Sequence, residues 1–153
     1  MTVTQATVDL YQEHAKRLIG YASTLVGPSQ AEDLVADAMV AVFARVDLAD
    51  VANPQAYLFA CVLNQARSDA RAQTSRRRRE RLVSGASRSA PPPEAADELG
   101  LLASLSTRER AVVYLTYWED QTVAEVADCL GVGDGTVRRY LARARAKIRQ
   151  ELR

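Results

Sequence analysis

Apolar residues recur at intervals of three and four along most of the chain, which is the spacing of one buried face of an α-helix. Alternating apolar and polar residues, the pattern of a half-buried strand, are almost absent. The helical pattern stops over RLVSGASRSAPPPEAA, whose prolines and small polar residues neither continue a helix nor build a core. The chain is therefore predicted to be all-α, with a small helical domain at 1–80, a flexible linker at 81–96 and a second small helical domain at 97–153.

The first domain has the pattern of a three-helix bundle. The spacing of Ser29 and Glu32 predicts a capping box at the start of its second helix. The segment DLADVAN ends that helix, after which Asn53 is the expected cap of the third helix and Pro54 fits its first turn. The third helix is expected over about residues 54–75 and changes from apolar to basic along its length.

The second domain is expected to contain four helices. One is predicted over residues 95–104, and the Ser106–Glu109 capping box starts the next. The last two belong to QTVAEVADCLGVGDGTVRRYLARAR, where apolar residues keep a helical spacing on both sides of a break at Gly131. Glycine tolerates the positive φ that a tight turn requires. This pattern predicts a helix-turn-helix.

The second helix of this motif is basic and is expected to begin near Gly133 or Asp134. An α-helix fits the major groove of duplex DNA, where its side chains reach base edges and its arginines neutralise phosphates. A helical hairpin with a solvated basic face is the alternative. The candidate DNA contacts of this domain are Thr122 in the first motif helix, and Thr136, Arg138, Arg139, Tyr140, Arg143 and Arg145 in the second.

Charge is distributed in blocks, although the net charge is only +1. Residues 1–70 hold 4 basic and 8 acidic side chains, whereas 71–90 hold 7 basic and 1 acidic. Residues 91–120 are acidic again, with 2 basic and 6 acidic side chains. Residues 121–153 are basic, with 7 basic and 4 acidic side chains. Because nucleic acid repels an acidic block and a basic protein surface attracts it, the blocks predict more than one kind of partner.

The sequence offers no set of residues for catalysis or for a metal. His14, Cys61 and Cys129 lie too far apart for a zinc-ligand pattern, and carboxylates are not clustered at ligand spacing. We therefore expect no cofactor, no metal, no enzymatic activity and two reduced core thiols. No apolar run approaches the ~20 residues of a membrane span, and the first residues do not resemble a secretion signal. These features predict a cytoplasmic protein without membrane insertion.

The order of these parts resembles an extracytoplasmic-function (ECF, group 4) sigma factor of bacterial RNA polymerase, in the sigma-70 family. The resemblance is carried by the AEDLV box, the helix that reads YLFACVLNQAR, and the closing helix GTVRRYLARAR, and it covers nearly the whole chain. It implies that the first domain is sigma region 2 and the second is sigma region 4. Such a protein binds core RNA polymerase, recognises promoter DNA and promotes transcription initiation.

The resemblance also implies partners for particular surfaces. The face with the AEDLV box would dock on the clamp helices of the polymerase β′ subunit, region 4 would bind the β flap, and an anti-sigma factor is a further expected partner. Carboxylates beside apolar groups suit such a contact, because they pair with arginines of a partner helix. A capping acid and a solvated face are the alternative. The candidate polymerase contacts are Asp33, Leu34, Asp37 and Met39, whereas Phe43 is expected in the core.

The loop before the third helix and the start of that helix match the part of region 2 that reads the minus-ten promoter element. An extruded base needs polar and aromatic groups around it. The alternative is that Tyr57 packs in the bundle and Asn53 only caps the helix. The run Arg76 to Arg79 fits either phosphate contact or a solvated stretch. The candidate contacts are Asn53, Gln55 and Tyr57 for the bases, and Asn64, Arg67 and Arg71 for the phosphates.

Region 4 would read the minus-thirty-five element. Tyr140 departs from the family pattern, which mostly has arginine there, since tyrosine stacks or donates a hydrogen bond but does not neutralise a phosphate. It is expected to face either a base edge or the core. The alternative function is a helix-turn-helix repressor or activator that binds an operator as a dimer. That alternative explains the second domain but leaves the acidic first domain without a role.

Overall fold

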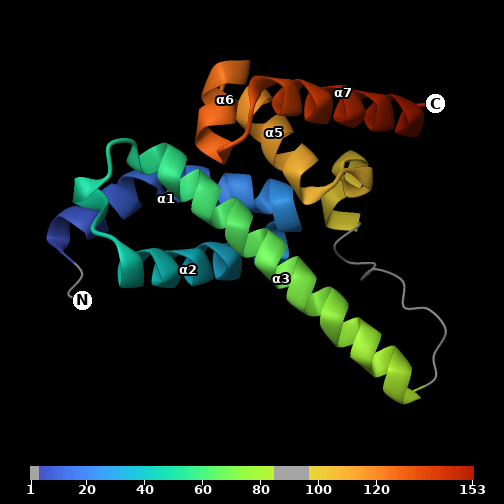
Figure 1. The fold of residues 1–153 in the computed structure, drawn as a ribbon, viewed down its shortest axis with the longest axis horizontal. Coiled ribbons are helices and arrows are strands. Elements are labelled where there is room, and N and C mark those ends of the chain that lie inside the picture. Colours follow the sequence, from blue (N-terminus) through green and yellow to red (C-terminus); the bar gives the residue numbers. More distant parts are fainter. Residues whose placement is uncertain (1–3, 85–96) are drawn as a thin grey trace.

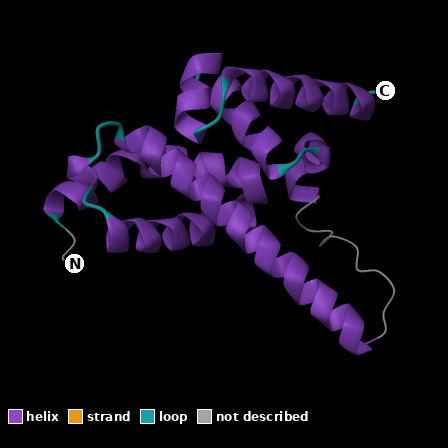
Figure 2. Cartoon of the chain, viewed as in Figure 1, coloured by secondary structure: helices purple, strands orange, loops and turns teal. Residues whose placement is uncertain are grey.

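The computed structural model of the protein describes residues 4–84 and 97–153. Figures 1 and 2 show helices joined by short loops, and no strand occurs in these two ranges. This confirms the all-α prediction. The first domain consists of α1 (Gln5–Val26), α2 (Pro28–Arg45), the 3-10 turn η1 (Leu48–Asp50) and α3 (Pro54–Ser84). The second consists of η2 (Gly100–Ser104), α5 (Thr107–Tyr117), α6 (Val123–Leu130) and α7 (Asp134–Glu151).

Several helix ends lie where local chemistry predicts them. Asn53 caps α3, its side-chain oxygen accepting the N–H of Ala56 at 3.2 Å. Ser106 and Glu109 form the complete capping box at the start of α5. Gly131 ends α6 with φ 68°, in the left-handed region. The turn of the helix-turn-helix is therefore confirmed at its glycine.

The start of α2 differs from the prediction, and the Ser29–Glu32 capping box is wrong. Gly27 is the residue before the helix, with φ 92°, and Pro28 occupies the first helical position. Because proline has a fixed φ suited to that position, the helix begins one residue before Ser29, which then lies inside it. The Ser29 hydroxyl instead donates to Glu98 of the second domain at 3.0 Å.

Two further elements differ in extent. α3 continues to Ser84, past the expected end near residue 75 and into the predicted linker, because no glycine or proline interrupts RRRRERLVS. Its second half projects away from the other helices in Figure 1. The expected helix at 95–104 is described from residue 97, and its Gly100–Ser104 part is a 3-10 helix in which Gly100 has φ 58°. The rest of the predicted linker, 85–96, lies outside the described residues.

The two domains pack directly against each other. Tyr21 of α1 and Phe59 of α3 are fully buried, with ring centroids 4.8 Å apart. Tyr114 of α5 completes the cluster, at 5.3 Å from Tyr21 and 6.4 Å from Phe59. One hydrophobic cluster therefore runs through both domains, and we call this packing the closed arrangement. The helical pattern alone does not predict it, since a proline-rich linker permits many arrangements.

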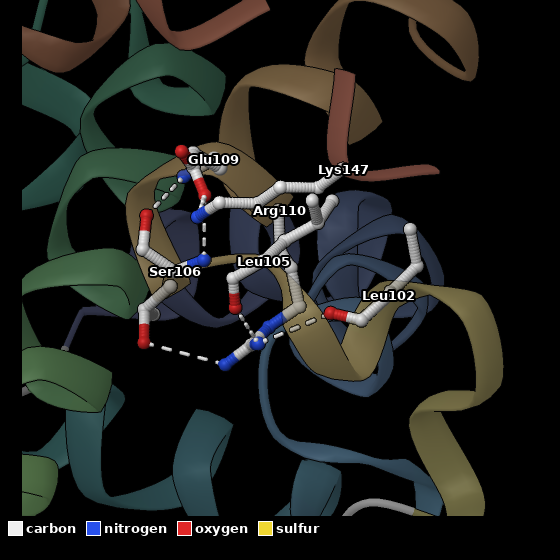
Figure 3. A network of polar contacts seen from close by, with 7 residues as sticks. Leu102, Leu105, Ser106, Glu109, Arg110 and Lys147 are labelled. Carbon is white, nitrogen blue, oxygen red and sulfur yellow. Dashed lines mark hydrogen bonds and ion pairs between the residues drawn. The ribbon is translucent and has the colours of Figure 1, made fainter. Parts of the chain in front are cut away.

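Polar contacts add to the closed arrangement. Arg110 of α5 donates from Nε to the Leu25 carbonyl at 3.1 Å, and its Nη1 donates to the carbonyls of Leu102 and Leu105. The Cys129 thiol of α6 donates to the Ala56 carbonyl of α3 at 3.4 Å. Figure 3 shows the Arg110 guanidinium reaching the carbonyls that precede α5. The Arg110 and Cys129 side chains thus satisfy backbone groups of the first domain.

Beside Arg110, an ion pair between the buried Glu109 carboxylate and the partly exposed Lys147 ties α5 to α7. The Glu109 side chain is 3% exposed, and its Oε1 accepts from Lys147 Nζ at 2.6 Å and from the Ser106 N–H at 2.8 Å. Burial raises the pKa of Glu109, but the hydrogen bonds from Lys147 and Ser106 outweigh it, so that the net pKa lies below its ordinary value. The carboxylate therefore stays charged and holds both helices (Figure 3).

Candidate nucleic-acid interface

α7 divides into a buried face and an exposed basic face. Its buried positions, Val137, Leu141 and Ala144, recur every three or four residues. Because these side chains anchor the helix to the domain, the opposite face is directed to solvent. That face carries the exposed Arg138, Arg139 and Arg143.

The threonines of the motif have local partners. The Thr122 hydroxyl accepts the N–H of Glu125 at 3.2 Å and therefore starts α6. The half-buried Thr136 accepts from Arg139 Nη2 at 3.1 Å, one turn along α7. This bond holds the Arg139 guanidinium close to the helix surface. DNA contact by either threonine stays a prediction.

Arg145 and Tyr140 both have side-chain partners on α5. Arg145 donates to the Tyr117 hydroxyl from Nε at 3.0 Å and from Nη2 at 2.8 Å, and its guanidinium lies 6.0 Å from the centre of that ring. Tyr140 is half-buried, and its hydroxyl accepts from Arg108 Nη1 at 3.3 Å. Tyr140 thus contacts α5, a neighbour that sequence spacing does not reveal.

The base-reading candidates of the first domain lie near the start of α3. The Asn53 side chain serves as the helix cap, and Gln55 accepts from Arg17 Nη1 at 3.1 Å. Tyr57 is half-buried, and burial raises its pKa, as does the nearby Cys61 thiol. Asn64, about two turns after Tyr57 on α3, is exposed. Capping by Asn53 and partial packing of Tyr57 are therefore present, and base contact by these residues stays a prediction.

The phosphate-contact candidates of α3 lie next to the second domain. Arg67, Arg71, Arg108 and Tyr140 line a cavity of about 350 Å³ between α3, α5 and α7. Burial lowers the pKa of Arg67, and the charges of Arg108 and Arg71 lower it further. The structure therefore brings candidates from both predicted DNA surfaces, Arg67 and Tyr140, to one place.

The polymerase candidates divide between surface and core. Asp33 and Asp37 are exposed on α2. Leu34 and Met39 are 4% and 3% exposed and belong to the hydrophobic core. A partner docking on α2 meets the two carboxylates, while the two apolar side chains support the helix from inside. Val40, which sequence reasoning missed, is 70% exposed on the same helix.

Sequence reasoning also missed an apolar groove on the second domain. Its volume is about 660 Å³, and it lies between η2, α5 and α7. Trp118 and Tyr117 at the end of α5 are 65% and 51% exposed, and Leu101 and Leu152 are 47% and 69% exposed. Their helical spacing is typical of core residues, so the sequence alone gives no sign that they remain uncovered. Large apolar surface of this kind is typical of binding sites.

Metal groups and membrane spans can be searched for in residues 4–84 and 97–153. This part of the chain contains no group of three or more histidine, cysteine or acidic residues placed to hold a metal ion. None of its helices is both long and apolar enough to cross a membrane.

Two family models match this chain. The profile of Sigma-70 region 2 matches residues 10–78, and that of Sigma-70, region 4 matches residues 101–150. The ECF RNA polymerase sigma factor SigL of Mycobacterium tuberculosis is 33% identical, covering 94% of this chain and 88% of its own length. An RNA polymerase sigma-E factor of Streptomyces avermitilis is also 33% identical, over 82% of this chain and 72% of its own length.

Two solved structures have the same fold as this chain. CnrH, in complex with the cytosolic domain of CnrY, superposes with a TM-score of 0.63 at 26% identity, over 97% of this chain and 88% of that chain. The sigma factor RpoE of Bartonella quintana, in complex with the anti-sigma factor NepR, has the same fold, with a TM-score of 0.63 at 23% identity over 94% of this chain and 96% of that chain.

These matches favour a sigma factor over a dimeric operator-binding repressor, because they extend through region 2 as well as the helix-turn-helix. The chain belongs to the ECF group of the sigma-70 family, the RNA polymerase sigma factors that bind the core enzyme, recognise promoter DNA and promote transcription initiation.

Proposed function

We propose that this sigma factor divides its contacts between its two domains, with region 2 on the β′ clamp helices and the minus-ten element, and region 4 on the minus-thirty-five element and the β flap. The exposed arginine face of α7 carries the proposal. Arg138, Arg139 and Arg143 are exposed, outside the buried face of a helix that follows a tight turn. A helix held in this way can enter the major groove with its basic side chains free to contact DNA.

The polymerase contact of region 2 is proposed at Asp33 and Asp37. Both carboxylates are exposed on α2, and the exposed Val40 adds an apolar contact beside them. Arginines of a partner helix form charge-assisted hydrogen bonds with such carboxylates. Leu34 and Met39 act from the core, by fixing the position of α2.

The β flap is proposed to bind the apolar groove of region 4. The groove is lined by large apolar side chains from three elements, and Trp118 and Leu152 are more than half exposed. An amphipathic segment that fills it removes this surface from water, which is the usual driving force of helix-in-groove binding. Because Arg145 also lines the groove and contacts Tyr117, it is assigned to the rim of this site rather than to DNA.

An anti-sigma factor is a further proposed partner. CnrH is seen with the cytosolic domain of CnrY, and the sigma factor RpoE of the same fold is seen with the anti-sigma factor NepR. This chain matches 88% and 96% of these two chains. The proposed role includes no catalysis, since a sigma factor acts through binding. A cytoplasmic location is proposed because the polymerase and the promoter are there.

The proposal is tested by run-off transcription with purified core polymerase and this protein. We expect a promoter-dependent transcript and co-purification of the protein with the core enzyme. The absence of both results contradicts the proposal. A stable dimer that binds one DNA operator without polymerase would instead favour the repressor.

A further inference from the structure

Positive charges of the two domains meet at the cavity between α3, α5 and α7. Arg67 and Arg71 enter it from α3, and Arg108 enters it from the start of α5. Every charged side chain that lines this cavity, within the described ranges, is one of these arginines. The remaining lining residues are Ala70, Ser106, Thr107 and Tyr140.

Nearby carboxylates do not neutralise these arginines. The ion pair between Lys147 and Glu109 involves none of these arginines. Asp69 of α3 accepts from the Gln65 amide at 3.0 Å and lines a neighbouring cavity instead. The closed arrangement therefore brings like charges together, which opposes domain packing unless an anion lies between them.

The groups at the cavity suit an oxyanion. A guanidinium presents planar pairs of N–H donors that match phosphate oxygens. The cavity also contains the first residues of α5, from Ser106 to Arg108, where the helix dipole favours negative charge. The Tyr140 hydroxyl already accepts from Arg108 at 3.3 Å and is free to donate its own proton.

We infer that this cavity binds a phosphate group between Arg67 and Arg71 of region 2 and Arg108 of region 4. Because both domains supply donors, the anion binds the closed arrangement and stabilises it. The same Arg67 and Arg71 are proposed to follow promoter phosphates, so a bound phosphate competes with DNA for them. Tyr140 takes part by accepting a hydrogen bond from Arg108 through its hydroxyl. An arginine at this position would instead add a further positive charge to the cavity.

Cys129 reports the closed arrangement. Its thiol is buried at the contact between the domains, bonded to the Ala56 carbonyl, and burial raises its pKa to about 12. Alkylation therefore requires the domains to separate. Cys61, which lies in α3 and is half-buried, serves as the reference thiol in the same molecule.

The test is the rate at which Cys129 of the full chain is alkylated, resolved from Cys61 by peptide mass spectrometry. At about ten times its dissociation constant, inorganic phosphate should slow Cys129 labelling about tenfold, with Cys61 unchanged. Potassium chloride at equal ionic strength is the control for screening. Pyrophosphate and ATP are parallel probes, and protection by ATP at lower concentration than phosphate identifies a nucleotide as the source of the phosphate group.

Two variants complete the test. Arg108→Gln and Arg67→Gln should each abolish the protection, because both residues lie at the cavity and neither belongs to the core. Arg153→Gln, an exposed arginine that does not line the cavity, should retain it. Equal slowing by chloride, no slowing by any phosphate, or full protection in Arg108→Gln overturns the inference. The experiment uses neither polymerase nor DNA, so its result is independent of the proposed function.

Discussion

The Glu98 carboxylate accepts hydrogen bonds from both the N–H and the hydroxyl of Ser29, at 3.3 and 3.0 Å. Ser29 lies in the first turn of α2, whose preceding residue, Gly27, has no side chain to cap it. Region 4 thus supplies the acidic group that the N-terminus of the proposed polymerase-binding helix lacks. A Cβ at Gly27 would lie 2.3 Å from Glu98 Oε2, so glycine at this position also makes room for the carboxylate.

Glu98→Ala should loosen the closed arrangement without unfolding either domain. Loss of an N-terminal capping group costs about 0.5–1 kcal/mol at an exposed site. That free energy raises the rate of Cys129 alkylation by roughly two- to fivefold. Asp97→Ala, an exposed neighbour, is the control. An unchanged Cys129 rate in Glu98→Ala would show that the cap does not contribute to domain packing.

Tyr21→Phe should stabilise the protein. The Tyr21 hydroxyl is buried and has no hydrogen-bond partner among the described residues, and burial raises its pKa well above the ordinary value. A buried unpaired polar group costs about 1–3 kcal/mol. Removing it leaves the ring contacts with Phe59 and Tyr114 in place, so the free energy of unfolding should rise by about 1 kcal/mol.

Chemical denaturation measures the effect of Tyr21→Phe. Tyr114→Phe is the matched control, because the Tyr114 hydroxyl donates to the Arg17 carbonyl at 3.4 Å and its loss should be neutral or slightly destabilising. A lower stability of Tyr21→Phe than of Tyr114→Phe would mean that the Tyr21 hydroxyl has a partner in solution, such as a buried water.

Glu109→Gln should destabilise region 4 in a pH-dependent way. The folded-state pKa of Glu109 is lowered, so its contribution is present above the unfolded-state pKa and is lost as the pH falls through the folded-state value. Near neutral pH the substitution should lower the free energy of unfolding by about 1–3 kcal/mol. The difference in stability between Glu109→Gln and the wild type should narrow as the pH falls below about 4.

Thermal unfolding between neutral and acidic pH measures this gap. Glu125→Gln is a matched control, since Glu125 occupies the same position in the first turn of α6 but is exposed. A gap that stays constant with pH would assign the effect to packing rather than to the charge of Glu109.

Local signals in the sequence predict the fold of each domain but not how the domains meet. Gly131 and the Ser106 cap depend on residues within one turn, and both predictions are confirmed. The Ser29 cap was wrong because Pro28 begins α2 one residue earlier, and the partner that the Ser29 hydroxyl bonds instead, Glu98, lies 69 positions away. Likewise, Tyr140 contacts Arg108 only because α5 and α7 cross there. Contacts between elements depend on packing, which the periodicity of one helix does not contain.

Asp37→Arg should weaken association with core polymerase while leaving promoter DNA binding by region 4 unchanged. The carboxylate is exposed on α2, so reversing its charge does not disturb the core but places a cation opposite the arginines expected on the partner. Competition with another sigma factor for core polymerase measures the change. Asp9→Arg, an exposed acidic residue of α1, controls for net charge. Equal competition by both variants would remove Asp37 from the contact.

Arg138→Ala and Arg139→Ala should each weaken binding to the minus-thirty-five element while core association is retained. If either arginine contacts a base, its loss costs about 1–3 kcal/mol for the preferred sequence, whereas loss of a phosphate contact weakens all sequences alike and lowers the salt dependence. Arg145→Ala is the comparison, because Arg145 lies two turns from Arg138 on the same side of α7 but is bonded to Tyr117 beside the apolar groove. It should leave DNA affinity nearly unchanged and weaken the β flap contact. Titration of promoter DNA at two salt concentrations separates these cases, and a loss of DNA affinity in Arg145→Ala as large as in Arg138→Ala would assign Arg145 to the DNA contact as well.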